Sequence, residues 1–178
     1  MTAKIKHFPG TPLSEKDFAD RKILFKFDEL KADYAWDTGI GIGSYLAALK
    51  NGIILGSACY TCNKIVVPPR TVCEWCFNPM DEYIPLKNTG TVNTFSLCYV
   101  TWDVQRISDP EIPIVVKLDG TSTLENGPIM GGILHLLGEV DPQDVKIGMR
   151  VQAVWKPAED REGAITDILY FKPIDGNH

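Results

Sequence analysis

Two Cys-x-x-Cys pairs, Cys59–Cys62 and Cys73–Cys76, constrain this sequence more than any other feature. A two-residue gap lets both thiolates of a pair turn back onto one ion, and the second pair completes a tetrahedral shell of four sulfurs. A closed shell leaves no open position for water or substrate, so it is typical of a structural metal site rather than a catalytic one. The arm between the pairs contains Pro68 and Pro69, which favour a stiff, tight turn.

Two disulfides or four unrelated thiols are the alternatives to a metal site. The N-terminal residues lack the apolar core of a signal peptide, and disulfides are rare in cytosolic proteins, so the metal interpretation is favoured. Four thiolates also bind a single redox iron, as in rubredoxin. Zinc is favoured because Asn63 and Phe77 follow the two pairs, where rubredoxin knuckles typically have glycine. We therefore predict one structural Zn²⁺, with Cys59, Cys62, Cys73 and Cys76 as ligands.

Composition and charge limit the function further. The 178 residues are 44% apolar and 23% charged, which is typical of a globular protein, and no apolar run is long enough to span a membrane. We expect a cytoplasmic protein that does not bind membranes. Residues 1–76 carry a net charge of +2 and residues 77–178 a net charge of −7. A surface that follows nucleic-acid phosphates needs a basic groove, so the larger half of the chain argues against that function.

Residues 1–52 are expected to form an N-terminal arm with short helices. Ser14 is placed to cap a helix that begins at Glu15. Ile23, Phe27 and Tyr34 recur at helical spacing, although the same stretch also alternates as a strand would, and we favour the helix. This aromatic-rich arm needs a surface to cover it, either within the chain or on a partner protein.

A second short helix is predicted at residues 45–51, with Ser44 as its N-cap and Gly52 at its end. The glycines of Gly39-Ile-Gly-Ile-Gly43 precede it. Their G-x-G-x-G spacing does not match a dinucleotide or phosphate-binding loop, so we interpret them as a flexible entry to the helix.

The rest of the chain is predicted to be β-structure. Residues 53–86 should form the zinc ribbon and residues 87–178 a five-stranded OB-fold barrel, with an open sandwich as the alternative. A helical turn is predicted at residues 141–148, between the third and fourth strands. The strands are expected at residues 91–102, 112–118, 129–137, 149–155 and 164–171.

No set of residues in the sequence suggests catalysis. Acyl transfer needs a nucleophile with a base beside it, and the histidines are His7, His135 and His178, none of them near Cys98 in the sequence. A nucleic-acid-binding zinc ribbon and OB protein is the alternative function, with Phe95, Tyr99 and Trp102 as stacking platforms.

The sequence resembles a family of bacterial and archaeal proteins that have a rubredoxin-like zinc ribbon followed by an OB fold and occur beside thiolases and other acyl-CoA enzymes. The resemblance rests on Leu55-Gly-x-x-Cys-x-x-Cys62 with Pro68-Pro-Arg-x-x-Cys-x-x-Cys76, and it extends over most of the chain. The further matching segments are Tyr34–Gly39, Cys76–Glu82, Asn88–Phe95 and Gly163–Pro173.

The resemblance implies a non-catalytic subunit in a hetero-oligomer with a thiolase-type acyl-CoA enzyme. Its expected role is to support thiolysis or condensation of a 3-ketoacyl-CoA, in aromatic-compound degradation or in acetoacetyl-CoA and HMG-CoA metabolism. All four ribbon cysteines match the family pattern, and no active-site residue is transferred. A contact with coenzyme A is expected to involve Lys50, Lys64 or Arg70, and the expected partner interface includes Phe27, Tyr34 and Trp36.

Overall fold

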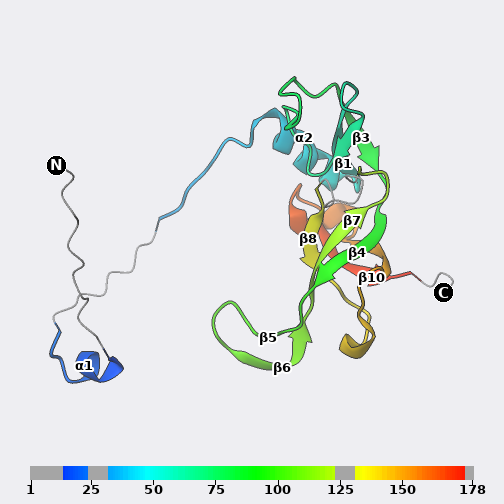
Figure 1. Cartoon of the computed structure of the whole chain (residues 1–178). Helices are drawn as coiled ribbons and strands as arrows, with labels where there is room; N and C mark the ends of the chain where they lie inside the picture. The colour runs from blue at the N-terminus through cyan, green and yellow to red at the C-terminus, as the bar shows by residue number, and fades with distance from the viewer. Residues whose placement is uncertain (1–13, 24–31, 123–130, 175–178) are drawn as a thin grey trace, which may run out of the picture. The chain divides into compact units, whose positions relative to one another are not determined.

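The computed structural model describes residues 14–23, 32–122 and 131–174 (Figure 1). The chain divides into two compact units, Met1–Trp36 and Asp37–His178. In the first unit, helix α1 (Glu15–Ala19) begins where the sequence predicted. The Asp17 carboxylate accepts hydrogen bonds from the backbone N–H of Ser14, at 3.0 Å, and from its hydroxyl, at 2.7 Å. The predicted helix around Phe27 lies mostly outside the described residues, and Tyr34 lies in an irregular segment, so a helix does not reach it.

Helix α2 (Gly39–Lys50) begins six residues earlier than predicted, and Thr38 rather than Ser44 is its N-cap. Tertiary packing overrides the low helix propensity of the glycines. A Cβ added at Gly41 would lie 3.3 Å from the carbonyl oxygen of Pro69, so glycine lets the helix approach the ribbon backbone. The predicted end of the helix is confirmed, because Gly52 has φ +73° and stops it.

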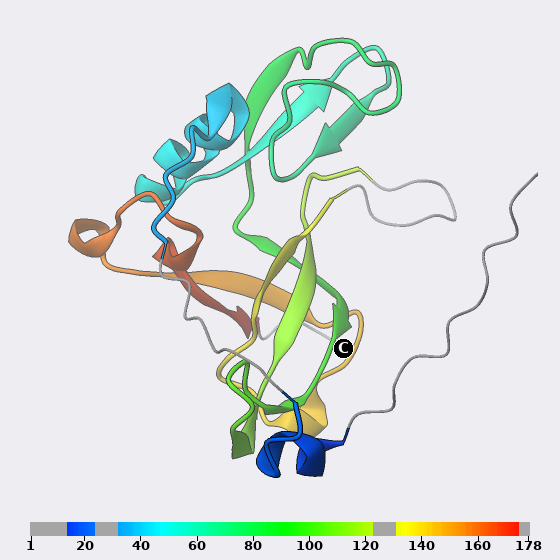
Figure 2. The same cartoon turned by 90° about the vertical axis from the view of Figure 1, so that its left-hand side faces the viewer.

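The ribbon is a three-stranded antiparallel sheet in the order β2-β1-β3. Its strands are β1 (Ile54–Cys59), β2 (Lys64–Val66) and β3 (Glu82–Leu86). Figure 2 shows α2 lying beside this sheet, and α2 also contacts the loop that precedes β10. The helix therefore bridges the ribbon and the barrel.

The second sheet has five strands in the order β10-β9-β4-β7-β8, and neighbouring strands pair antiparallel. It closes into a barrel. A parallel bridge between Leu137 and Phe171 joins its two edges, and the backbone N–H of Gly138 donates to the carbonyl of Phe171 at 2.8 Å. The 3₁₀ turn η1 (Pro142–Asp144) lies between the third and fourth barrel strands, as predicted. This arrangement is an OB fold, and the open sandwich is excluded. The strands are β4 (Thr89–Phe95), β7 (Pro113–Leu118), β8 (Ile133–Leu136), β9 (Arg150–Trp155) and β10 (Ile168–Pro173).

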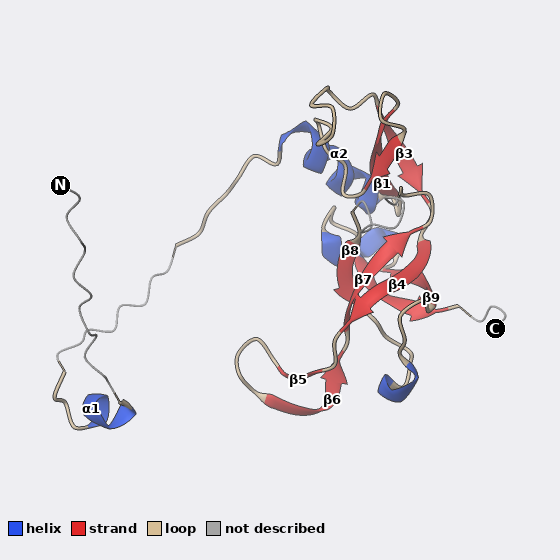
Figure 3. Cartoon of the chain, in the orientation of Figure 1, coloured by secondary structure: helices blue, strands red, loops and turns tan. Residues whose placement is uncertain are grey.

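The prediction of one continuous strand over residues 91–102 is wrong, because this segment forms parts of two separate strands. Strand β4 ends at Phe95, and the chain then leaves the barrel as a separate two-stranded hairpin of β5 (Cys98–Val100) and β6 (Arg106–Glu111), coloured red in Figure 3. The register of β4 against β7 already shifts between Val92 and Thr94, which marks a bulge where the strand bends away. Strand β6 was not predicted, because Pro110 and the polar residues around it are poor strand signals.

Two other strands begin four residues later than predicted. Strand β8 begins at Ile133 instead of residue 129, and residues 123–130 lie outside the described part of the chain. Strand β10 begins at Ile168 instead of residue 164, because η3 (Ile165–Asp167) forms a tight turn before it. The short turn η2 (Ala158–Asp160) lies in the same β9–β10 loop.

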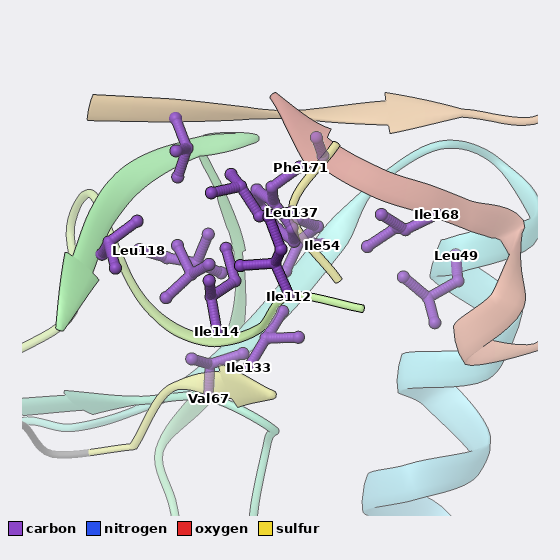
Figure 4. Close-up of a cluster of buried hydrophobic side chains, with 14 of the residues drawn as sticks. Leu49, Ile54, Val67, Ile112, Ile114, Leu118, Ile133, Leu137, Ile168 and Phe171 are labelled. Carbon is purple, nitrogen blue, oxygen red and sulfur yellow. The ribbon is translucent and has the colours of Figure 1, made fainter. Parts of the chain in front are cut away.

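Among the described residues, one hydrophobic core joins the barrel to the base of the ribbon (Figure 4). Leu49 of α2 and Ile54 of β1 lie in it together with Ile114 and Phe171 of the barrel, and all four are essentially inaccessible to solvent. Each such side chain contributes about 1.5–3 kcal/mol by burial. The ribbon strand that leads to the first cysteine is therefore anchored in the barrel core.

Candidate metal centre

The four ribbon cysteines are positioned by the ends of the strands. Cys59 is the last residue of β1, Cys62 lies in the turn before β2, and the second pair lies in the loop between β2 and β3. The residues that follow the two pairs, Asn63 and Phe77, have φ values of +52° and +58°. This left-handed conformation turns the backbone back toward the sulfurs, and it explains why glycine is common there in related knuckles.

The sulfur atoms are close enough to bind one ion. The Sγ atoms of Cys59 and Cys76 are 3.6 Å apart, those of Cys62 and Cys73 are 3.9 Å apart, and all four lie within 4.8 Å of one another. A tetrahedral ion with metal–sulfur bonds of about 2.3 Å places its ligands about 3.8 Å apart, whereas a disulfide needs about 2.05 Å. The cysteines are not disulfide-bonded, and they could hold a metal ion.

The electrostatics of the cluster favour a bound cation. The pKa of the Cys73 thiol is lowered to about 7, chiefly by a hydrogen bond from the backbone N–H of Cys76. Burial opposes this shift, and the backbone N–H of Trp75 adds to it. The pKa of Cys62 is raised to about 12, first by its contact with the Cys76 side chain and second by burial. A charge on one sulfur thus opposes charges on its neighbours. A divalent cation would neutralise these charges and let all four sulfurs act as thiolates.

Hydrogen bonds hold the loop that carries the second cysteine pair. The backbone N–H of Arg70 donates to the buried Ser57 hydroxyl at 2.9 Å, and the N–H of Phe77 donates to the carbonyl of Cys73 at 2.9 Å. On the other side, the N–H of Tyr60 donates to the Asp81 carboxylate at 2.5 Å. These bonds fix the backbone around the sulfurs without using the sulfurs themselves.

The structure brings together two of the three lysine and arginine residues predicted to contact coenzyme A. Lys64 and Arg70 border the same shallow recess beside Cys73, and Trp75 also lines it. Arg70 is paired with Glu74. Lys50 lies elsewhere, exposed in the last turn of α2.

Of the three residues predicted at a partner interface, two are described. Tyr34 and Trp36 stack on each other with ring centroids 6.2 Å apart, and 76% and 83% of their surfaces are exposed. Phe27 lies outside the described residues.

The described residues show no catalytic pair around Cys98 or His135. Cys98 is half-buried on β5, and His135 packs edge-on against Phe171 with ring centroids 5.9 Å apart. Nε2 of His135 lies 3.4 Å from the carbonyl oxygen of Ile165, and burial lowers the pKa of this histidine. This environment fits a structural histidine.

No helix within residues 14–23, 32–122 and 131–174 is long and apolar enough to cross a membrane.

Sequence reasoning missed the exposed tip of the β5–β6 hairpin. Trp102 is 94% exposed and Val104 is 80% exposed. Asp103 is the only common turn residue between them, and a single aspartate is a weak indication that the strand reverses there.

Comparisons with known proteins agree with this architecture. Residues 83–156 match the family described as "ChsH2, C-terminal OB-fold domain". A "DUF35 domain-containing scaffold protein" from Methanocaldococcus jannaschii is 30% identical over 125 residues, which cover 68% of this chain and 82% of that protein.

Two solved structures have the same fold. A DUF35-family protein of unknown function from Sulfolobus solfataricus superposes with a TM-score of 0.54 and 24% identity, over 66% of this chain and 79% of that one. A structure named "Ltp2-ChsH2(DUF35) aldolase" superposes with a TM-score of 0.54 and 18% identity, over 79% of this chain and 98% of that one.

Proposed function

Because this chain belongs to the DUF35 family, we propose that it is a non-catalytic, zinc-binding accessory subunit of a thiolase-type acyl-CoA enzyme. The observation that carries the proposal is the closed four-cysteine site on a ribbon that shares its core with an OB barrel. Four sulfurs complete a tetrahedral shell, so a metal there has no position for a substrate. Its role is to hold the ribbon, and the function of the chain lies in its surfaces.

The names of two similar proteins support a role in a complex. The relative from M. jannaschii is described as a scaffold protein. The name of one structure with the same fold pairs a DUF35 chain with Ltp2 in an aldolase. The thiolase-type partner itself is proposed from the resemblance of the ribbon motif, and so is the reaction, thiolysis or condensation of a 3-ketoacyl-CoA.

The N-terminal unit supplies the proposed partner contact. Tyr34 and Trp36 offer two stacked, exposed rings, and large aromatic side chains are typical anchors of protein interfaces. Phe27 is proposed as a third anchor from the sequence. The complex is therefore a hetero-oligomer in which this arm binds the enzyme.

Coenzyme A is proposed to contact the recess beside the metal site. Lys64 and Arg70 border this recess and carry charges that suit the phosphates of coenzyme A, and Trp75 offers a ring for stacking on its adenine. The ion pair with Glu74 must open, or be shared, for Arg70 to bind a phosphate. Lys50 remains a separate candidate on α2.

Nucleic-acid binding is not favoured. Of the proposed stacking residues, Phe95 packs against the barrel core, while Tyr99 and Trp102 lie on the hairpin outside the barrel. They therefore do not form one continuous platform on a barrel strand, and the net charge of −7 on residues 77–178 repels phosphates.

The test is co-expression of the full chain with a thiolase-like enzyme of the same organism, chosen first from its neighbouring genes. Size-exclusion chromatography should show a complex, and thiolysis of a 3-ketoacyl-CoA should require both chains. Trp36→Ala should weaken the complex, while a matched change at the exposed Glu159, Glu159→Gln, should not. Turnover of the thioester by the isolated chain, or full activity of the enzyme without it, would contradict the proposal.

A further inference from the structure

The β5–β6 hairpin presents apolar side chains that the rest of the described chain does not cover. It leaves the barrel between β4 and β7 and extends away from the ribbon (Figures 1 and 2). Tyr99 and Val100 on β5 are about half exposed, and Trp102 and Val104 at the tip are almost fully exposed. Exposed apolar side chains gathered on one projecting element mark an interaction site, whereas isolated ones are common on protein surfaces.

The tip is held in one conformation by its own hydrogen bonds. The N–H of Thr101 donates to the carbonyl of Gln105 at 2.9 Å, and the N–H of Val104 donates to the carbonyl of Thr101 at 3.0 Å. The Thr101 hydroxyl contacts the Asp103 carboxylate and accepts from the N–H of Gln105 at 3.1 Å. These bonds hold Val104 at φ +66°, which is unfavourable for a β-branched residue. A fixed turn that exposes Trp102 loses little conformational freedom when it binds.

The charge of the hairpin indicates its partner. Residues 98–111 contain three carboxylates, Asp103, Asp109 and Glu111, and one arginine, Arg106, so their net charge is −2. This charge disfavours nucleic acid and anionic membranes. It also disfavours a second copy of this chain, whose net charge is −5. A basic surface on a different protein is the complementary partner.

We infer that the hairpin is a second docking element, which inserts Trp102 and Val104 into an apolar recess rimmed by Lys and Arg side chains on the acyl-CoA enzyme. This inference rests on the proposed function and adds a contact from the second unit, Asp37–His178, to the one proposed for the N-terminal unit. The Trp102 ring at the tip supplies the buried anchor, and the carboxylates of Asp109 and Glu111 on β6 match the basic rim.

The experiment measures, by isothermal titration calorimetry, the affinity of the full chain for the thiolase-like enzyme that is used in the co-expression test. Trp102→Ala should raise the dissociation constant about 30-fold or more, as expected for a central anchor. The control is Ile147→Ala, since Ile147 is also exposed on the barrel unit but lies in the loop before β9. Unfolding midpoints of both variants should match that of the wild type, because neither side chain is in the core.

A second variant tests the charge argument. Replacing Asp109 and Glu111 with Lys should weaken binding at 50 mM NaCl and remove most of the salt dependence of the wild-type complex. Equal weakening at 500 mM NaCl would contradict a basic rim. The same preparations are examined alone by sedimentation and with vesicles of phosphatidylserine and phosphatidylcholine. Self-association or vesicle binding that depends on Trp102 would overturn the proposed occupant.

The outcomes separate the two proposals. If the wild-type chain binds the enzyme and Trp102→Ala binds equally well, the hairpin inference is wrong and the accessory-subunit proposal stands. If the wild-type chain does not bind the enzyme, the accessory-subunit proposal is wrong, and the assignment of the hairpin to this partner is wrong with it.

Discussion

The Asp167 side chain should be one of the most important polar groups for stability. It is completely buried, and its carboxylate accepts backbone hydrogen bonds from Glu162 at 3.0 Å, Gly163 at 2.7 Å and Ala164 at 3.1 Å. These bonds close the β9–β10 loop against α2, where a Cβ added at Gly163 would lie 3.1 Å from the Leu46 carbonyl oxygen. Losing the carboxylate would free the loop and uncover one side of the helix.

The magnitude follows from the donors that would lose their partner. A hydrogen bond to a charged group contributes about 1.5–3 kcal/mol, so three could contribute about 4.5–9 kcal/mol in full. The donors lie in a partly exposed loop, where water can replace some of the lost bonds. We therefore expect Asp167→Ala to lower the free energy of unfolding by about 3–5 kcal/mol, in the range found for breaking a buried charged contact. Asp167→Asn keeps one acceptor oxygen, so it should lower the free energy of unfolding by about half as much as Asp167→Ala.

The dependence on pH gives a second measurement on the same residue. Burial raises the pKa of Asp167, but the three N–H donors and Lys156 outweigh it, so the pKa lies below its usual value of 3.8. A lowered pKa means that the carboxylate stabilises the fold fully above pH 3.8 and loses this effect as the pH falls through the folded-state pKa. The difference in unfolding free energy between wild type and Asp167→Asn should therefore shrink below about pH 4.

Urea unfolding followed by circular dichroism measures both effects. The control is Asp160→Ala, which removes an exposed carboxylate from the same loop and should change the free energy of unfolding by less than about 0.5 kcal/mol. If the free energy of unfolding of Asp167→Ala lay within about 0.5 kcal/mol of the wild-type value, the three hydrogen bonds would not be important for stability.

Two further predictions concern the metal site and a surface ion pair. Cys62→Ser and Cys73→Ser should each abolish stoichiometric zinc measured by elemental analysis, because each variant removes one of the four thiolate ligands. Full zinc content in either variant, or freshly purified wild-type protein whose ribbon is ordered without metal, would contradict the site. The Arg150 guanidinium donates two hydrogen bonds to the Asp119 carboxylate, at 2.6 and 2.7 Å. These bonds, with a smaller contribution from the Thr89 hydroxyl, lower the pKa of Asp119 to about 2. Because both side chains are partly exposed, Asp119→Asn should lower the free energy of unfolding by less than about 1 kcal/mol at pH 7. Thermal unfolding at several pH values should show that this loss disappears as the pH falls from about 4 through 2. A loss that stayed constant over this range would contradict the prediction.

The parts of the fold that the sequence predicted are those with local signals. The cysteine spacing predicted the cluster, and the largely apolar segments at residues 112–118 and 149–155 predicted β7 and β9, whose buried positions include Ile114 and Val151. The turn at Pro142–Asp144 was also predicted, and there the Asp141 carboxylate accepts a hydrogen bond from the N–H of Gln143 at 2.9 Å.

The parts that were missed depend on contacts between distant residues. Helix α2 extends through Gly41 because the ribbon lies against that position, and this contact is not visible in the local sequence. Strand β10 starts later than predicted because the Asp167 carboxylate accepts hydrogen bonds from the backbone of Glu162, Gly163 and Ala164 and closes the loop before it. The hairpin at Thr101–Gln105 has Asp103 as its only common turn residue, and its reversal also depends on the Thr101 hydroxyl and a strained Val104.

A metal held by the four cysteines would stabilise a different part of the second unit from the barrel core. In the loop that carries the second cysteine pair, Val72, Trp75 and Phe77 are all exposed, so burial of apolar side chains contributes little to its order. At the other end of β1, Ile54 lies in the same core as Phe171. Removal of a metal should therefore loosen the loop around Cys73 and leave the barrel folded. Because this loop also borders the recess of Lys64 and Arg70, the metal would keep that recess in shape without taking part in chemistry.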